Sequence, residues 1–359
     1  MSLSIIIPNL LGISYGSYSD QTIRGNFFTW FTDGYQKHTF YHLASKGFFY
    51  SANQVSAILL LLFPVLLYYL IKTTSWKIFV LTFLQVWAMF LLGTRTAIYG
   101  SILMLAAIVL LGLFYTFWKK EIKFQMKNLI YFNILILFVG ILFPFSPIHS
   151  RKEVQENINH EGLAYALVEQ TDDLSSQEMT REDKITYIEE NYEEKRILEH
   201  FIIRSYPYIY DPDFWYEILQ LPTELRTNWR YLEKQMLDRV IEINHNPYDK
   251  WLGISYTRVQ NIFNLEQDFL VQYYSVGICG MILFLAGYFI MIAKISFDIV
   301  KKKLSHCFLP LCLLYASCVF LAVSYFSGNL LNSLMVTPYL CLILGYATKE
   351  VKGGMKYET

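Results

Sequence analysis

Charged residues stand at two places where the chain turns into an apolar run, and their types suggest chemistry. Arg95 lies in the turn GTRTA between two apolar segments, and Glu266 and Asp268 stand just before another that begins near Phe269. A guanidinium is always charged and binds phosphate oxygens through paired N–H groups, so Arg95 suits a diphosphate held at a membrane surface. A carboxylate there could take the proton from an attacking hydroxyl as a general base.

Each of these residues also has a structural interpretation. An arginine at a membrane turn can extend its guanidinium into water and do nothing more. Acidic residues before a helix are stabilised by the helix dipole without any catalytic role. Because residues two apart do not share a helix face, only one of Glu266 and Asp268 is expected to point into a shared site.

A long polar segment between the apolar runs holds the other candidates. Arg239, at the end of a predicted helix, is a second candidate for diphosphate binding, and possible accessory residues are Arg204, Arg230, His245 and Arg258. For any single arginine the alternative is an ordinary surface ion pair. For His245, beside Asn246-Pro247, the alternative is a structural turn residue.

Metal and cofactor signals in the sequence are weak. Asp211-Pro212-Asp213 could hold a divalent ion, but a solvated turn in an acidic loop fits it better. The five cysteines lie in or at apolar runs without CxxC spacing, which favours buried small side chains over thiolate sites. The sequence has no Walker loop or GxGxxG. We therefore expect no metal, no cofactor and no nucleic-acid partner.

The composition predicts an integral membrane protein. Of 359 residues 54% are hydrophobic and only 17% are charged, against about 25% in a typical soluble domain. Long apolar runs predict seven membrane spans. Their approximate ranges are 53–71, 78–93, 98–118, 129–145, 269–292, 307–325 and 330–346.

The predicted fold is an all-α polytopic membrane protein with about seven transmembrane helices and one large, mainly helical external loop. We expect an external interfacial segment (1–50), membrane helices 1–4 (51–147), the large loop (148–268), membrane helices 5–7 (269–347) and a cytoplasmic tail (348–359). Within the acidic loop, charge spacing and apolar periodicity predict helices over 180–198 and 223–243.

The lysines predict the orientation of these spans. Thirteen of the 30 basic residues, all of them lysines, follow spans one, three, five and seven, which places these thirteen on one side, and the positive-inside rule makes that side cytoplasmic. These lysines are Lys72, Lys77, Lys119, Lys120, Lys123, Lys127, Lys294, Lys301, Lys302, Lys303, Lys349, Lys352 and Lys356. Residues 1–50, the Arg95 turn and the large loop are then expected outside the bacterial cytoplasmic membrane.

Several short motifs occur in a fixed order along these elements. They are GFFYSAN (47–53), TRTA (94–97), Arg239 on a loop helix, GISY (253–256), Glu266 to Asp268, and GICG (277–280). In this order and topology they resemble the bacterial O-antigen ligase/polymerase family over about residues 40–345. Two departures are Ser255, where the family pattern has a glycine, and Glu266/Asp268, where ligases have a histidine. These favour a polymerase or another glycan transferase over a core ligase.

The resemblance implies a GT-C-like, metal-independent membrane glycosyltransferase, a polysaccharide polymerase or ligase. Its donor would be a glycan on undecaprenyl diphosphate, and its acceptor a hydroxyl of a glycan or glycolipid. Arg95 and Arg239 would stabilise the leaving diphosphate, and Glu266 or Asp268 would act as the base. The family's usual N-terminal spans are expected to be missing here. The alternatives are a transporter or flippase for lipid-linked sugar, and a non-catalytic fragment.

Overall fold

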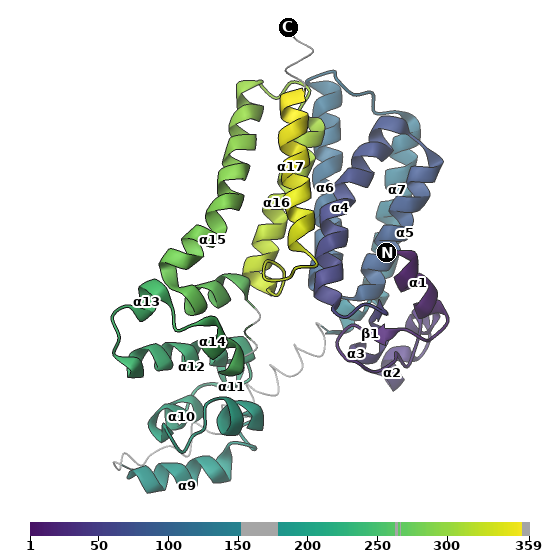
Figure 1. The fold of residues 1–359 in the computed structure, drawn as a ribbon. Coiled ribbons are helices and arrows are strands. Elements are labelled where there is room, and N and C mark those ends of the chain that lie inside the picture. Colours follow the sequence, from purple (N-terminus) through teal and green to yellow (C-terminus); the bar gives the residue numbers. More distant parts are fainter. Residues whose placement is uncertain (152–178, 263–264, 266, 354–359) are drawn as a thin grey trace. The chain divides into compact units, whose positions relative to one another are not determined.

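The protein is mainly helical, with almost no sheet, in the computed structural model, which describes residues 1–151, 179–262, 265 and 267–353 (Figure 1). The chain forms two compact units. The membrane unit comprises residues 1–152 and 286–359, and the insert unit comprises residues 153–285. The prediction of an all-α polytopic membrane protein is confirmed. Each unit is described below by itself.

Helices form at all seven predicted spans. They are α4 (Ala52–Thr73), α5 (Trp76–Leu92), α6 (Arg95–Phe117), α7 (Met126–Leu142), α15 (Asp268–Lys301), α16 (Phe308–Ser327) and α17 (Thr337–Gly353). In the described part of the chain, five are long and apolar enough to cross a membrane, with α7 counted as part of a segment from Met126 to Arg151. The other two, α5 and α17, have 17 residues each. At 1.5 Å per residue that is about 25 Å, slightly less than a typical hydrocarbon core.

The last span begins later than the sequence predicts. A helix was expected from residue 330, but α17 starts at Thr337. Gly328 and Asn329 adopt positive φ values of 66° and 57°, which ends α16 and turns the chain. Pro338 lies in the first turn of α17, where its missing N–H costs nothing. The expected start was wrong because apolar residues in this turn continue the hydrophobic run without continuing the helix.

Helix α4 forms the centre of the membrane unit. It packs against α5, α6 and α16, and α16 packs in turn against α17. Several polar side chains buried among these helices are neutral and bonded to the backbone. Gln85 of α5 donates to the carbonyl of Leu59 (2.7 Å), and Ser317 of α16 donates to that of Leu313 (2.9 Å). Burial of neutral, satisfied groups gives a close-packed helical core.

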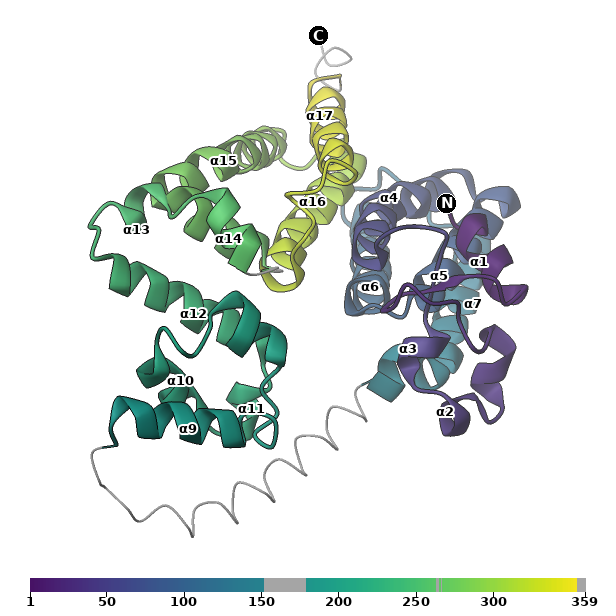
Figure 2. The same cartoon turned by 60° about the horizontal axis from the view of Figure 1, so that its bottom comes forward.

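The first 50 residues fold into a small layer of short elements. They are α1 (Leu3–Leu10), β1 (Tyr15–Gly16), the 3₁₀ turn η1 (Phe27–Phe31), α2 (Gly34–Lys37), α3 (Phe40–Leu43) and β2 (Ser45–Gly47). Strands β1 and β2 pair in antiparallel fashion. Figure 2 shows this layer beside the helix ends where α5 leads into α6. The hydroxyl of Tyr35 donates to the carbonyl of Phe145 just after α7, which ties the layer to the helices (2.8 Å).

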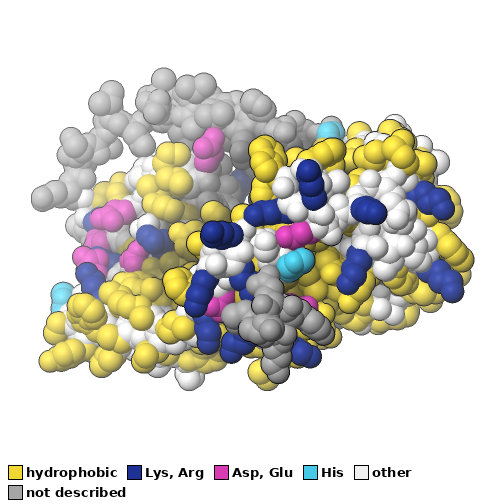
Figure 3. All heavy atoms as spheres, turned by 90° about the horizontal axis from the view of Figure 1, so that it is seen from above, with side chains coloured by type: hydrophobic (Ala, Val, Ile, Leu, Met, Phe, Trp, Pro, Cys, Tyr) yellow, Lys and Arg dark blue, Asp and Glu magenta, His cyan; other side chains and the backbone are white. Residues whose placement is uncertain are grey.

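The lysine-rich connections meet at one end of the membrane unit. Lys119, after α6, donates through Nζ to the carbonyl of Lys303, after α15 (2.6 Å). The carboxylate of Glu121 accepts from the backbone N–H of His306 (2.9 Å), and Asn128 donates to the carbonyl of Ile71 near the end of α4 (3.1 Å). Figure 3, which views the structure from this end, shows Lys and Arg side chains spread over the helix ends. The segments therefore share a side; the assignment of that side to the cytoplasm stays a prediction.

The insert unit is built from short helices around an apolar core. Its elements are α9 (Arg181–Asn191), the π-helical turn η3 (His200–Ser205), α10 (Pro212–Leu219), α11 (Thr223–Arg226), α12 (Trp229–Asn244), α13 (Asp249–Leu252), α14 (Tyr256–Ile262) and the first part of α15. The core includes Trp215, Leu232, Met236, Leu237 and Tyr274.

The predicted helix over 223–243 is two helices. Asn228 lies between α11 and α12, and its side-chain oxygen accepts from the N–H of Tyr231, which starts a new helix. The prediction of one helix was wrong because this cap interrupts the apolar periodicity. Within α12, Leu232, Met236 and Val240 are buried, whereas Trp229 and Ile243 lie on the surface.

Candidate functional site

The turn between α5 and α6 is fixed by the residues around Arg95. Gly93 ends α5 with φ +60°, and Thr94 caps α6 by accepting from the N–H of Ala97 (3.1 Å). The Thr94 hydroxyl also bonds to the hydroxyl of Ser56 on α4 (2.7 Å). Arg95 is therefore the first residue of a 23-residue helix, whose N-terminal end carries a partial positive charge.

Arg95 lies on the wall of a pocket together with a second arginine. The pocket has a volume of about 320 Å³ and is lined by Arg95, Tyr99, Ile148 and Arg151. Two arginines and a tyrosine at the start of a helix form an environment that suits an anion with several oxygens. Because α6 begins at this pocket and ends at Phe117, two residues before Lys119, the pocket and the lysine-rich segments lie at opposite ends of the helix.

Arg151 is the residue of this pocket that sequence reasoning did not single out. It follows the fourth apolar run in PFSPIHSR and counts among the arginines of the acidic insert, where a surface ion pair was the default interpretation. The structure instead places its guanidinium over two aromatic rings, 5.0 Å from the centroid of Tyr18 and 5.7 Å from that of Phe40. The aromatic composition of residues 1–50 indicated that rings were available there for a cation. No sequence spacing, however, relates those rings to Arg151.

Comparison with known protein families agrees with the fold. The family model described as O-antigen ligase like membrane protein matches residues 1–352. The chain belongs to this family. No curated protein and no solved structure matches it. Membership supports a role in membrane glycan transfer and confirms the resemblance carried by the short motifs.

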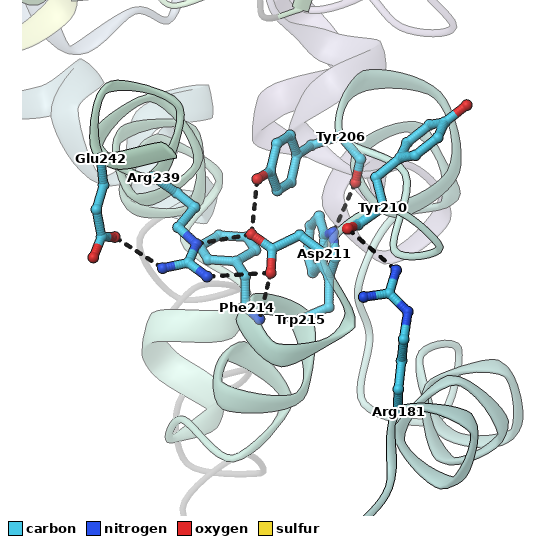
Figure 4. A network of polar contacts seen from close by, with 8 residues as sticks. All are labelled: Arg181, Tyr206, Tyr210, Asp211, Phe214, Trp215, Arg239 and Glu242. Carbon is cyan, nitrogen blue, oxygen red and sulfur yellow. Dashed lines mark hydrogen bonds and ion pairs between the residues drawn. The ribbon is translucent and has the colours of Figure 1, made fainter. Parts of the chain in front are cut away.

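In this O-antigen ligase-like protein, Arg239 lies in a polar network of the insert unit (Figure 4). Its Nε and Nη2 donate to the two oxygens of Asp211 (2.8 and 3.3 Å), and its Nη1 donates to Glu242 (2.9 Å). Asp211 also accepts from the hydroxyl of Tyr206 (2.9 Å) and from the N–H of Phe214 (3.3 Å). As a diphosphate ligand, Arg239 would have to exchange these carboxylates for phosphate oxygens.

Asp211 therefore does not lie in the solvated turn that the sequence predicts. It is buried and caps α10, and the Asp-Pro pair at the start of a helix was the signal for this. Burial by itself would raise the pKa of Asp211, but hydrogen bonds from Arg239, Tyr206 and Phe214 hold that pKa below its usual range. Paired with Asp211 and Glu242, Arg239 has its pKa raised.

The replacement Asp211→Asn is expected to destabilise the insert unit by about 1.5–3 kcal/mol at neutral pH, because it removes charge-assisted bonds from a buried acceptor. The folded-state pKa lies below the value of about 3.9 for an unfolded aspartate. The stabilisation is therefore present above about pH 4 and is lost as the pH falls through the folded pKa. Hydrogen exchange at the amide of Phe214 in the full-length protein measures the effect.

Glu242→Gln is the matched control for Asp211→Asn. Glu242 contacts the same guanidinium but its side chain is 66% exposed, so its loss is expected to change the stability by less than about 1 kcal/mol. Equal protection of the Phe214 amide in the two variants at neutral pH would contradict the proposed role of Asp211.

One of the two candidate bases stands at the start of α15. Asp268 is its first residue and is fully buried, which places a carboxylate at the positive end of a long helix. Glu266 lies outside the described residues. Because each unit is described by itself, a meeting of Asp268 or Arg239 with Arg95 stays a prediction.

The possible accessory residues lie at varied places in the insert unit. Arg204 pairs with Glu199 (3.4 Å) and its side chain is largely exposed. Arg230 is partly buried near the start of α12, and Arg258 is exposed on α14. His245 ends α12 in a left-handed conformation (φ +49°) and is exposed. Their roles in binding stay predictions.

The GISY and GICG motifs meet each other in the insert unit. Gly253 has φ +80°, and a Cβ there would lie 2.5 Å from the backbone of Ser275 and Val276. Gly277 has φ +67°, and a Cβ there would lie 2.2–2.4 Å from the backbone of Trp251 and Leu252. Gly277 is therefore a close-packing glycine. The glycines let the segment after α12 lie directly against the kink in α15.

Ser255→Gly is expected to stabilise the insert unit by up to about 1 kcal/mol. Ser255 adopts φ +81°, which is strained for a residue with a Cβ. Its hydroxyl accepts weakly from the N–H of Arg258 (3.4 Å), and replacing a cap by glycine costs only a few tenths of a kcal/mol. Ser255→Ala keeps the strain and loses the cap, so thermal stability of the full-length protein should fall in the order Gly, Ser, Ala. A different order would contradict this account.

Proposed function

We propose that this protein transfers a glycan from an undecaprenyl-diphosphate carrier to a hydroxyl of another glycan or glycolipid at the outer side of the cytoplasmic membrane. The observation that carries the proposal is the pocket that holds Arg95 and Arg151 at the start of α6. It lies at the end of α6 opposite the lysine-rich segments, which the positive-inside rule assigns to the cytoplasm.

The proposed reaction forms one bond and breaks one. The acceptor oxygen bonds to the anomeric carbon of the donor sugar, and the bond between that carbon and the diphosphate oxygen breaks. Negative charge then grows on the polyprenyl diphosphate, and preorganised guanidinium groups stabilise it. Arg95 and Arg151 would supply this charge without a metal ion. We propose Arg239 as a further ligand of the diphosphate.

A carboxylate must receive the proton that the acceptor hydroxyl loses. We assign this role to Asp268, with Glu266 as the second candidate. Asp268 is the first residue of α15 and therefore stands at a helix N-terminus. An ionised carboxylate within hydrogen-bond reach of the acceptor would act as the general base. Whether the acceptor is a growing polymer or a different glycolipid decides between polymerase and ligase.

A transporter for lipid-linked sugar is the competing function. Transporters carry ionisable residues along a pathway at mid-membrane depth. Among the described residues of α4, α5 and α16, the buried polar side chains are hydroxyls and an amide, such as Ser56, Gln85 and Ser317. This distribution favours chemistry at the surface over passage through the membrane.

The test uses the purified full-length protein in lipid vesicles with a polyprenyl-diphosphate-linked oligosaccharide labelled in its glycan. Transfer predicts a longer glycan product and release of an equal amount of polyprenyl diphosphate. Recovery of chemically unchanged donor in the opposite leaflet would indicate transport and contradict the proposal. Donor that binds but stays unchanged, with an acceptor present, would contradict it as well.

A further inference from the structure

Tyr18 is held close to the arginine pocket by the small sheet of the N-terminal layer. It lies two residues after β1, and the N–H of the intervening Ser17 donates to the carbonyl of Ala44 beside β2 (2.9 Å). The Tyr18 ring packs edge-to-face against Phe40 (5.4 Å between centroids) and Tyr41 (5.7 Å). These contacts hold the ring in place independently of its contacts with arginine.

The hydroxyl of Tyr18 connects the two arginine-bearing segments. It donates to the carbonyl of Gly93, two residues before Arg95 (2.8 Å), and accepts from Nη1 of Arg151 (3.1 Å). A phenolic hydroxyl has one proton to donate. Because Gly93 receives that proton, the oxygen faces Arg151 as an acceptor. The bond to Gly93 thus sets the direction in which Tyr18 holds Arg151.

The ring of Tyr18 contributes a second contact to the same guanidinium. Arg151 lies over its face at 5.0 Å, within the range of a cation–π interaction. Burial raises the pKa of Tyr18, while the positive charges of Arg151 and Arg95 act in the opposite direction. Both arginines are therefore close enough to act on this phenol. Two like charges at one pocket repel, so Arg151 needs contacts that keep it there.

We infer that Tyr18 is a positioning residue that holds Arg151 in the pocket beside Arg95, so that the two guanidinium groups together bind a diphosphate. This inference rests on the proposed function and extends it to the N-terminal layer. Arg151 uses one of its five N–H groups on Tyr18, and the phosphate oxygens of a diphosphate offer acceptors for others. A monophosphate has fewer oxygens to span two guanidiniums, so Tyr18 should favour diphosphate.

The test measures binding of inorganic diphosphate and inorganic phosphate to the purified full-length protein in nanodiscs of zwitterionic lipid. Tyr18→Phe keeps the ring but loses both hydrogen bonds, and should weaken diphosphate binding about three- to tenfold. Tyr18→Leu loses the ring as well and should weaken it further. Both variants should lose the preference for diphosphate over phosphate, which a purely structural role would not change.

Tyr35→Phe is the matched control. Tyr35 belongs to the same layer and its hydroxyl also donates to a backbone carbonyl, that of Phe145. Its replacement should leave diphosphate affinity unchanged. Equal affinity in the wild type, Tyr18→Phe and Tyr18→Leu, with weaker binding by Arg151→Ala, would overturn this inference alone. Absence of diphosphate binding by the wild type would overturn the proposed function too.

Nanodiscs with phosphatidylglycerol distinguish the source of the phosphate. A site for a free or carrier diphosphate should keep its affinity when anionic lipid is added. If phosphatidylglycerol lowered the diphosphate affinity of the wild type to that of Tyr18→Leu, the ligand would be a lipid headgroup. That result would overturn the diphosphate assignment.

Discussion

Replacing Arg95 by alanine is expected to lower the rate of glycan transfer by about 10²–10³-fold, the usual loss when one preorganised donor to a developing negative charge is removed. Arg95 lies at the start of α6 in a pocket shared with Arg151. Arg95→Lys keeps the charge but loses the planar fork, so it should recover only part of the rate. The measurement is release of polyprenyl diphosphate by the purified protein, or accumulation of lipid-linked repeat units in a producing strain.

Arg24→Ala is the control for the Arg95 variants. Arg24 is an exposed arginine of the N-terminal layer, and neither the pocket nor the polar network includes it. Its removal changes the net charge by the same amount and should leave the rate within about twofold. If the Arg95→Ala protein assembled full-length polysaccharide at the rate of the Arg24→Ala protein, the proposed mechanism would be wrong.

Gly277→Ala is expected to destabilise the kink in α15 by about 3–5 kcal/mol, among the largest effects of a single substitution. Gly277 has φ 67° and ψ −174°, a conformation essentially restricted to glycine. An added Cβ would also lie 2.2 Å from the carbonyl carbon of Trp251, and backbone atoms cannot move aside as a side-chain tip can. The segment before α14 would have to separate from α15.

Hydrogen exchange at Ile254 reports this separation directly. Its N–H donates to the carbonyl of Tyr274 across the contact between the two segments (2.8 Å). In Gly277→Ala this amide should lose its protection. Gly287→Ala is the control on the same helix, because a Cβ at Gly287 would meet nothing within 4 Å. Loss of Ile254 protection in both variants, or in neither, would contradict the close-packing account.

The sequence predicted the membrane helices well because their signal is local. Apolar runs of about 20 residues have few other stable structures, and each of the seven predicted runs forms a helix. The turn at Arg95 could also be predicted, since Gly93 and Thr94 are typical residues for ending one helix and starting the next. Errors occurred at 223–243 and at residue 330, where a single cap or turn interrupts an otherwise continuous pattern.

The contact partners of the charged residues could not be predicted from the sequence. Asp211 and Arg239 are 28 positions apart and Tyr18 and Arg151 are 133 apart. No periodicity relates such pairs, because their contacts arise only when separate elements pack. The contact between Gly253 and the kink at Gly277 is of the same kind, although each motif by itself is visible in the sequence.

The sequence by itself determined that this chain is a helical membrane protein of the O-antigen ligase-like family, with Arg95 at the turn between two apolar segments. Hydropathy and helix caps depend on residues close together in the chain, so they can be predicted from the sequence alone. Only the tertiary structure decided that Arg151 and Tyr18 share the neighbourhood of Arg95 and that Asp211 binds Arg239. These contacts join distant segments, and they form only where packing brings the segments together.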